Sequence, residues 1–183
     1  MGLRMTGFGA MVGACSAMPR ELVAVAPADN AMKSSDSVRH EGGVVFAALM
    51  PHAPILVPAV AGENLSACRA SVDAMGAVAR RLVAARPEAV VLVSPHAPRQ
   101  TRCYGLTRKT VNGSLAQFHA PGAAVELPGD PELVAALDAA TANRGLEMNE
   151  FPSTRLDHGS VVPLWHLVQA GWRGPTVVIA LVW

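Results

Sequence analysis

The sequence predicts an α/β fold with a mostly parallel central sheet and helices on both faces. Continuous apolar runs of strand length, such as AVVLVS at residues 89–94, alternate with longer segments in which apolar residues recur every three or four positions. Apolar residues make up 51% of the chain and aromatic residues only 4%, so the core should consist mainly of small side chains. With 183 residues, the chain is long enough to bury the core of one domain.

The N-terminal part of the chain lacks the periodicity of a folded segment. Residues 1–43 contain the polar stretch APADNAMKSSDSVRHEGG and are expected to form a disordered leader, or to reflect an over-extended start. An early arginine, a short apolar stretch and VGAC at residues 12–15 loosely resemble an export signal, but glycines interrupt the apolar stretch. We therefore expect one domain over residues 44–183.

The first half of this domain predicts a strand, a helix and a second strand. VVFAALM at residues 44–50 is a continuous apolar run, as expected of a buried central strand. Residues 64–87 carry one apolar helical face and end at Pro87, and a second strand is expected at residues 89–94. Such a unit is expected to close as a right-handed parallel crossover.

The second half predicts two further helices and two further strands. They are an antiparallel or edge strand at residues 103–111, a loop at 113–122, a helix at 129–145, a loop leading into a helix at 157–171, and a buried strand at 175–183. The helix at 129–145 has Asp130 as a candidate N-cap, Pro131 in its first turn and Gly145 after its end. Because the chain ends with that last strand, the sheet is expected to be truncated at its C-terminal side.

The tetrapeptide PHAP occurs twice, at residues 51–54 and 95–98, each time after a predicted strand. Ligands of open parallel sheets bind beyond the carboxyl ends of the strands. If the two strands are neighbours, His52 and His96 face the same crevice, and the flanking prolines restrict the backbone around each ring. Two neutral imidazoles on stiff supports suit a divalent first-row metal, so we expect His52 and His96 to be metal ligands.

A third histidine, His158, lies in the motif DHG at a predicted junction between a loop and a helix. An imidazole there could move a proton to or from a substrate hydroxyl, and Gly159 leaves room for a ligand. The alternative is a capping turn, with Asp157 as N-cap and His158 merely exposed. The remaining histidines are given no chemical role: His40 lies in the leader, His119 follows no apolar strand, and His166 is expected to be a packing or surface residue.

Charge and cysteine content exclude several classes of partner. The net charge is +1 and the arginines are scattered, so no nucleic-acid partner is expected. No apolar run approaches the ~18 residues that span a bilayer, so no membrane partner is expected either. Three widely spaced cysteines, Cys15, Cys68 and Cys103, form no CxxC pair. A disulfide framework or cysteine-based zinc site is therefore not expected, and a cytoplasmic location is.

Four segments together resemble the class III extradiol ring-cleavage dioxygenases, specifically the family of their catalytic subunit and its Memo-associated relatives. They are, in order, LMPHAPILVPAV, RPEAVVLVSPHAP, LAQFHAPGAAVEL and LDHGSVVPLWHL. The resemblance extends from about Val44 to the C-terminus. It implies a mostly parallel α/β sheet with the active site at the strand ends, in agreement with the fold expected from the residues alone.

The resemblance also implies a site and a chemistry. The family's two metal-binding histidines fall on His52 and His96, and its acid–base histidine falls on His158. It implies non-haem Fe(II), although two imidazoles also accept Zn or Mn, together with a catechol-like substrate and O2. The family's third metal ligand follows a later strand, and no residue occupies that position before the chain ends at Trp183.

Three functions remain open at this stage. The first is an Fe(II)-dependent extradiol dioxygenase, and the second is a Memo-like module that binds a metal or ligand without turnover. A metal-dependent hydrolase could use the same histidines, but it would need a carboxylate base over a metal-bound water. A sheet with an open edge could also pair with a second copy of the chain or with a different partner protein.

Overall fold

The computed structural model describes residues 43–97, 103–151 and 155–181. The leader predicted for residues 1–43 lies outside this part of the chain, except for its last residue. The helices are α1 (Pro58–Ala61), α2 (Leu65–Ala84), α3 (Pro131–Ala142) and α4 (His158–Gln169), with 3₁₀ turns η1 (Pro54–Leu56), η2 (Gly62–Asn64) and η3 (Ala116–Phe118). The strands are β1 (Val90–Ser94), β2 (Tyr104–Leu106), β3 (Val111–Leu115), β4 (Ala120–Leu127), β5 (Met148–Glu150) and β6 (Thr176–Ala180).

Four of these strands form the central sheet, in the order β1-β6-β2-β5. β1 pairs with β6 in parallel, and β2 pairs with β5 in parallel. β6 and β2, which join the two pairs, are antiparallel. The expectation of a mostly parallel sheet is thus confirmed, with one antiparallel junction at its centre.

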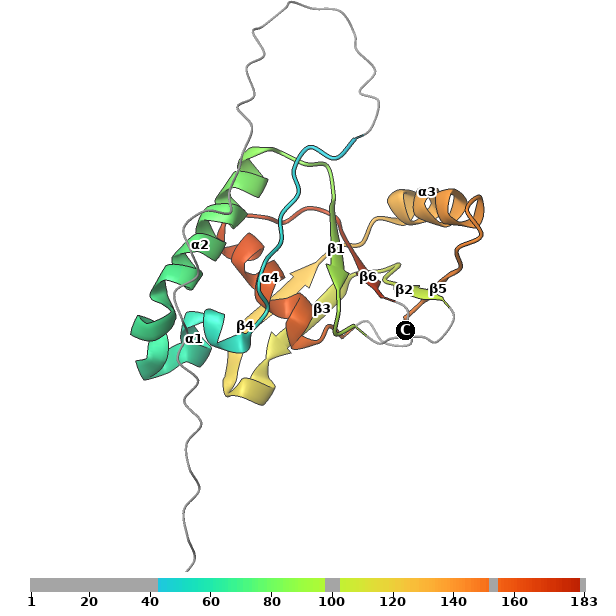
Figure 1. Ribbon diagram of the computed structural model, residues 1–183. Helices are drawn as coiled ribbons and strands as arrows, with labels where there is room; N and C mark the ends of the chain where they lie inside the picture. Colours follow the sequence, from blue (N-terminus) through green and yellow to red (C-terminus); the bar gives the residue numbers. More distant parts are fainter. Residues whose placement is uncertain (1–42, 98–102, 152–154, 182–183) are drawn as a thin grey trace, which may run out of the picture. The chain divides into compact units, whose positions relative to one another are not determined.

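Helices cover both faces of this sheet, as expected. Successive side chains of a strand point to opposite faces, and β6 follows this rule. Val178 packs in the cluster that includes residues of α2 and α4, whereas Val177 packs with Val134 of α3. Figure 1 shows α2 and α4 on one side of β1 and β6, and α3 on the other.

The prediction of a strand at residues 44–50 is wrong. The segment has no regular secondary structure, and Val44 and Leu49 are 87% and 99% exposed. An apolar run becomes a strand only when a neighbouring strand satisfies its backbone, and within the described residues β1 pairs with β6 alone. Val91 and Val93 of β1 are accordingly half-exposed, and the expected crossover through residues 44–94 does not form.

The prediction of a loop at residues 113–122 is also wrong, because this region belongs to a β-hairpin. β3 and β4 pair antiparallel with Val111 opposite Leu127, and a 3₁₀ turn joins them. His119 closes the turn in the left-handed conformation, with a φ of 60°. Alternating burial along β4 places one of its faces against the core.

The helices agree closely with the sequence. α2 ends before Pro87, and the Asp130 side chain caps α3 by accepting a hydrogen bond from the Leu133 amide at 2.9 Å. β5 was not expected. No helix among the described residues has the length and apolar character needed to cross a membrane.

Candidate histidine site

His52 lies in an irregular segment just before η1. The buried side chains of Leu56 and Val57 anchor this segment to the core, and η1 is closed by a hydrogen bond from the Leu56 amide to the Ala53 carbonyl at 2.9 Å. The His52 ring itself is half-buried. A short turn with buried apolar side chains therefore fixes the position of His52. The sequence predicted a position at the end of a strand instead.

His96 lies two residues beyond the end of β1, as the sequence predicts. The Ser94 side chain is 1% exposed and the Ala97 side chain is 2% exposed. Buried neighbours on both sides thus fix the backbone, while His96 itself is exposed. The parallel pairing of β1 with β6 orients the carboxyl end of β1.

His158 is the first residue of α4, directly after its N-cap. The Asp157 carboxylate accepts hydrogen bonds from the amides of Gly159 at 2.6 Å and Ser160 at 3.2 Å, and from the Ser160 hydroxyl at 3.2 Å. These bonds fix the first turn of α4. The Asp157 N-cap named as an alternative is therefore present, but the His158 ring is half-buried against other rings rather than fully exposed.

The structure brings the three histidine rings together from three separate segments. The Nε2 atoms of His52 and His96 are 2.9 Å apart, so one ring donates a hydrogen bond and the other accepts it. Ring centroids are separated by 4.7 Å for His52 and His96, 4.9 Å for His96 and His158, and 6.3 Å for His52 and His158. The Phe118 ring packs edge-on against His158, with the centroids 5.5 Å apart.

Gly159 makes this close approach possible. A Cβ atom at this position would lie 2.9 Å from Cδ2 and 3.0 Å from Cβ of His96, and 2.8 Å from Oδ1 of Asp157. Real Cβ atoms essentially never approach other atoms so closely. The glycine of the DHG motif therefore leaves space for the His96 side chain. From the sequence, we expected this glycine to leave space for a ligand.

The surroundings of His52 favour its neutral form. Partial burial lowers the pKa of His52, and the neighbouring His96 and His158 lower it further, against an opposing effect of Asp157. A metal ligand must present an unprotonated nitrogen. The electrostatics of the cluster therefore suit an imidazole that binds a cation.

The donor set fits part of a metal site. Two imidazole nitrogens 2.9 Å apart could both contact one divalent ion of the first transition row. The part of the chain that the structure describes contains no group of three or more His, Cys, Asp or Glu side chains arranged to hold a metal. Asp157, the carboxylate nearest in sequence to the cluster, already accepts three hydrogen bonds at the start of α4.

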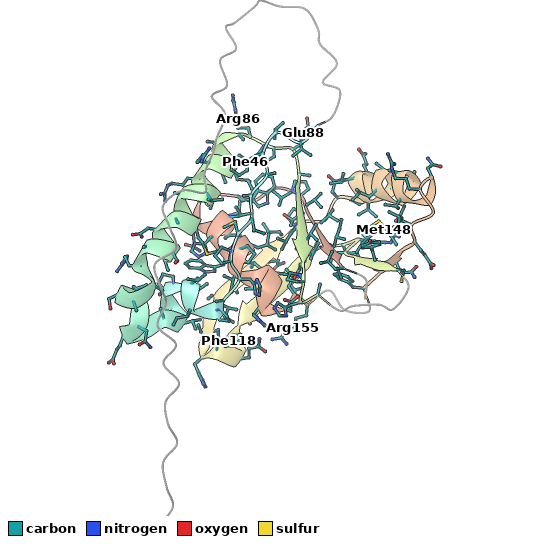
Figure 2. The ribbon with its side chains drawn as sticks, in the orientation of Figure 1. Phe46, Arg86, Glu88, Phe118, Met148 and Arg155 are labelled. Carbon is teal, nitrogen blue, oxygen red and sulfur yellow. The ribbon has the colours of Figure 1, made fainter. Side chains whose placement is uncertain are left out.

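A pocket of about 640 Å³ adjoins the cluster. His96, Asp157 and His158 line it, and Leu156 contributes an apolar side chain. The other lining residues are Ser114 on β3, Gln117 in η3, and Arg155. Figure 2 shows Arg155 and Phe118 at the same end of α4.

Sequence reasoning missed three other residues that line this pocket. Ser114 and Gln117 fall in the region expected to be a loop, and Arg155 lies in no motif. The alternation of residues in VNGSL could have indicated strand β3, and therefore the face of the strand on which Ser114 lies. Nothing in the sequence indicated Arg155.

The other histidines of the described region lie apart from the pocket lining. His119 is exposed in the hairpin turn. His166 is 4% exposed inside α4, which agrees with a packing role, and its Nε2 donates a hydrogen bond to the Leu56 carbonyl at 3.0 Å.

An α/β sheet with histidines clustered beside a polar pocket is typical of a metal-dependent enzyme. The family model described as the catalytic LigB subunit of aromatic ring-opening dioxygenase matches residues 46–182. The match covers most of the chain, and the chain therefore belongs to this family, as the resemblance predicted. Membership indicates aromatic ring-opening dioxygenase activity. Among curated proteins, none matches the sequence.

Proposed function

We propose that this domain is an Fe(II)-dependent extradiol dioxygenase that opens the ring of a catechol-like substrate. The observation that carries the proposal is the convergence of His52, His96 and His158 beside one pocket, in a chain of the LigB family. The three imidazoles come from residues that are distant in sequence, and we propose two different roles for them. The rings of His52 and His96 are in direct contact, and His96 and His158 line the pocket.

In this proposal His52 and His96 hold the iron. Their nitrogens are close enough to share one ion, and the lowered pKa of His52 keeps that ring neutral near pH 7. When bound, the iron would provide a Lewis acid for the substrate oxygens and a centre that reacts with O2. The described residues include no third ligand arranged with the pair.

His158 is proposed to handle the substrate proton. Its ring lies in the pocket lining and 4.9 Å, between centroids, from His96. A hydroxyl bound beside the metal pair would lie within reach of this imidazole, which could accept the hydroxyl proton and return it to the product. The Phe118 ring packs against this imidazole, with the ring centroids 5.5 Å apart.

The experiment loads the purified protein with Fe(II) without oxygen, then adds O2 and a panel of catechols. We expect O2 uptake and a yellow ring-fission product. His158→Ala should abolish turnover and keep the iron, whereas His52→Ala and His96→Ala should lose the iron. His119→Asn, in the exposed hairpin turn, should change neither. Full iron binding by His52→Ala and His96→Ala would contradict the assignment of the ligands.

A second candidate function has one observation in its favour. The histidine pair is not joined by a third metal-binding side chain among the described residues, as would suit a Memo-like module that binds a metal or ligand without turnover. A folded, iron-loaded protein that is inert towards the whole panel would favour this module over the dioxygenase.

A further inference from the structure

The helix α4 is connected to all three histidines of the cluster. His158 is its first residue, and the His96 side chain lies directly against the position that follows. His52 lies in a different segment, but α4 reaches this segment as well, because Nε2 of His166 donates a hydrogen bond to the Leu56 carbonyl at 3.0 Å. One helix is therefore the common support for the three imidazoles.

The hydrogen bond from His166 acts on the turn that follows His52. Leu56 is the last residue of η1, and its amide donates to the Ala53 carbonyl at 2.9 Å. Ala53 is the neighbour of His52 in the chain. Because a hydrogen bond is directional, a donor on the Leu56 carbonyl fixes the orientation of the whole turn and of the residue that precedes it.

Apolar packing alone does not specify this orientation. Leu56 and Val57 are buried in the large core cluster, which keeps the segment against the core. The hydrophobic effect is non-directional, so it tolerates small shifts of the turn. The contact between the Nε2 atoms of His52 and His96, at 2.9 Å, does not tolerate such shifts.

We propose that His166 is a positioning residue for His52, and that its hydrogen bond to Leu56 holds the Nε2 atoms of His52 and His96 within reach of one ion. This inference rests on the proposed function, which makes His52 a metal ligand. Groups that orient metal ligands commonly contribute 10- to 100-fold to metal affinity. Since His166 acts through the backbone rather than on the imidazole itself, we expect a contribution of about tenfold.

The test titrates zinc, which has no redox chemistry, into the metal-free protein in competition with a chelator. His166→Gln and His166→Met have side chains of similar length, and only the glutamine offers an N–H group to the Leu56 carbonyl. His166→Gln should bind zinc nearly as tightly as the wild type, and His166→Met about tenfold more weakly. Equal zinc affinities of these two variants would overturn the inference.

Val134→Ala is the control for a general loss of stability. Val134 is 2% exposed and packs in the smaller core cluster with Leu106 and Val177, apart from the cluster that contains Leu56. The variant should unfold more readily in urea and bind zinc like the wild type. If it lost zinc affinity as His166→Met does, the effect would be one of stability, and the positioning role would be excluded.

A measurement on the wild-type protein covers the case in which His166→Met does not fold. Coupling between two sites is reciprocal, so zinc should slow the exchange of the His166 Nε2 proton with solvent, followed by NMR, by the same factor of about ten. The reference is the indole N–H of Trp172, which donates to the Thr176 hydroxyl at 3.0 Å beyond the end of α4. General stabilisation by a bound ligand slows both protons alike, and that outcome would also overturn the inference.

His52→Ala, titrated in the same way, separates this inference from the proposed function. Full zinc binding by His52→Ala would remove the ligand role of His52, and the positioning role of His166 with it. Weak binding by His52→Ala, combined with equal affinities of His166→Gln and His166→Met, would overturn the positioning role alone.

Discussion

The Nε2 atom of His166 lies 3.0 Å from the carbonyl oxygen of Leu56, although 110 positions separate the two residues. The imidazole is 4% exposed in the middle of α4, and Leu56 closes the turn that follows His52. Since the carbonyl can only accept, His166 donates this hydrogen bond, and burial lowers the pKa of its ring and so favours the neutral form. One buried hydrogen bond thus joins the helix that begins at His158 to the segment that carries His52.

Replacement of His166 should destabilise the fold. In His166→Ala the Leu56 carbonyl loses its donor in a buried place and a cavity forms, so the free energy of unfolding should fall by about 2 kcal/mol or more. His166→Gln keeps a donor and should lose less. Urea unfolding followed by circular dichroism measures both. His119→Asn is the control, and stability of His166→Ala equal to that of the wild type would show that the bond contributes nothing.

The same residue should make stability depend on pH. Burial lowers the pKa of His166 from its ordinary value of 6.5, and the hydrogen bond to Leu56 opposes this only in part. Below pH 6.5 the unfolded chain takes up a proton that the folded chain still refuses. The free energy of unfolding should therefore decrease as the pH falls through 6.5, and level off below the folded pKa.

Unfolding curves at pH 7.5 and 5.5 isolate this contribution when the wild type is compared with His166→Gln. The variant lacks the titrating ring, so its stability should change less between the two pH values. All other ionisable residues are the same in both proteins. An identical pH dependence in the two would assign the acid sensitivity to other groups.

Gly159→Ala should disturb the histidine cluster. The new methyl group would collide with the His96 side chain and with Oδ1 of Asp157, so at least one of these two side chains must shift. A displaced ligand commonly costs 10- to 100-fold in metal affinity, and we expect a loss of about tenfold in Fe(II) binding. Gly122→Ala, where a Cβ meets nothing within 4 Å, should bind iron normally. Unchanged affinity in Gly159→Ala would argue against His96 as a ligand.

Local signals in the sequence predicted the helices well. The start of α3 follows from Asp130 and Pro131, and the end of α2 follows from Pro87, because caps and breakers act within one turn. The pairing of strands is not local. Residues 44–50 and 90–94 are similarly apolar, yet only the latter finds a partner strand among the described residues. Composition alone could not distinguish them.

The same contrast between local signals and long-range contacts applies to the residues of the candidate site. The repeated PHAP motif and the DHG motif led to His52, His96 and His158, because each histidine has distinctive neighbours in the chain. Gln117 lies in the segment LAQFHAPGAAVEL and Arg155 directly precedes LDHGSVVPLWHL, but neither was identified as a pocket residue from the sequence. They reach the pocket through the hairpin and through the bridge to Asn112, contacts that depend on the folded structure.

The two N-caps of the longer C-terminal helices provide a matched pair for the last prediction. Asp157 caps α4 and Asp130 caps α3, and each replacement by alanine should cost about 1 kcal/mol of stability, with Asp157 at the higher end because it accepts three hydrogen bonds. Only α4 begins with a residue of the histidine cluster. Asp157→Ala should therefore reduce O2 uptake by the iron-loaded protein well beyond its effect on stability, and Asp157→Ser, which restores a cap, should recover much of it. Asp130→Ala should unfold more readily in urea yet keep its turnover at 25 °C. If the two alanine variants lost turnover to the same extent, the fixed first turn of α4 would have no special part in placing His158.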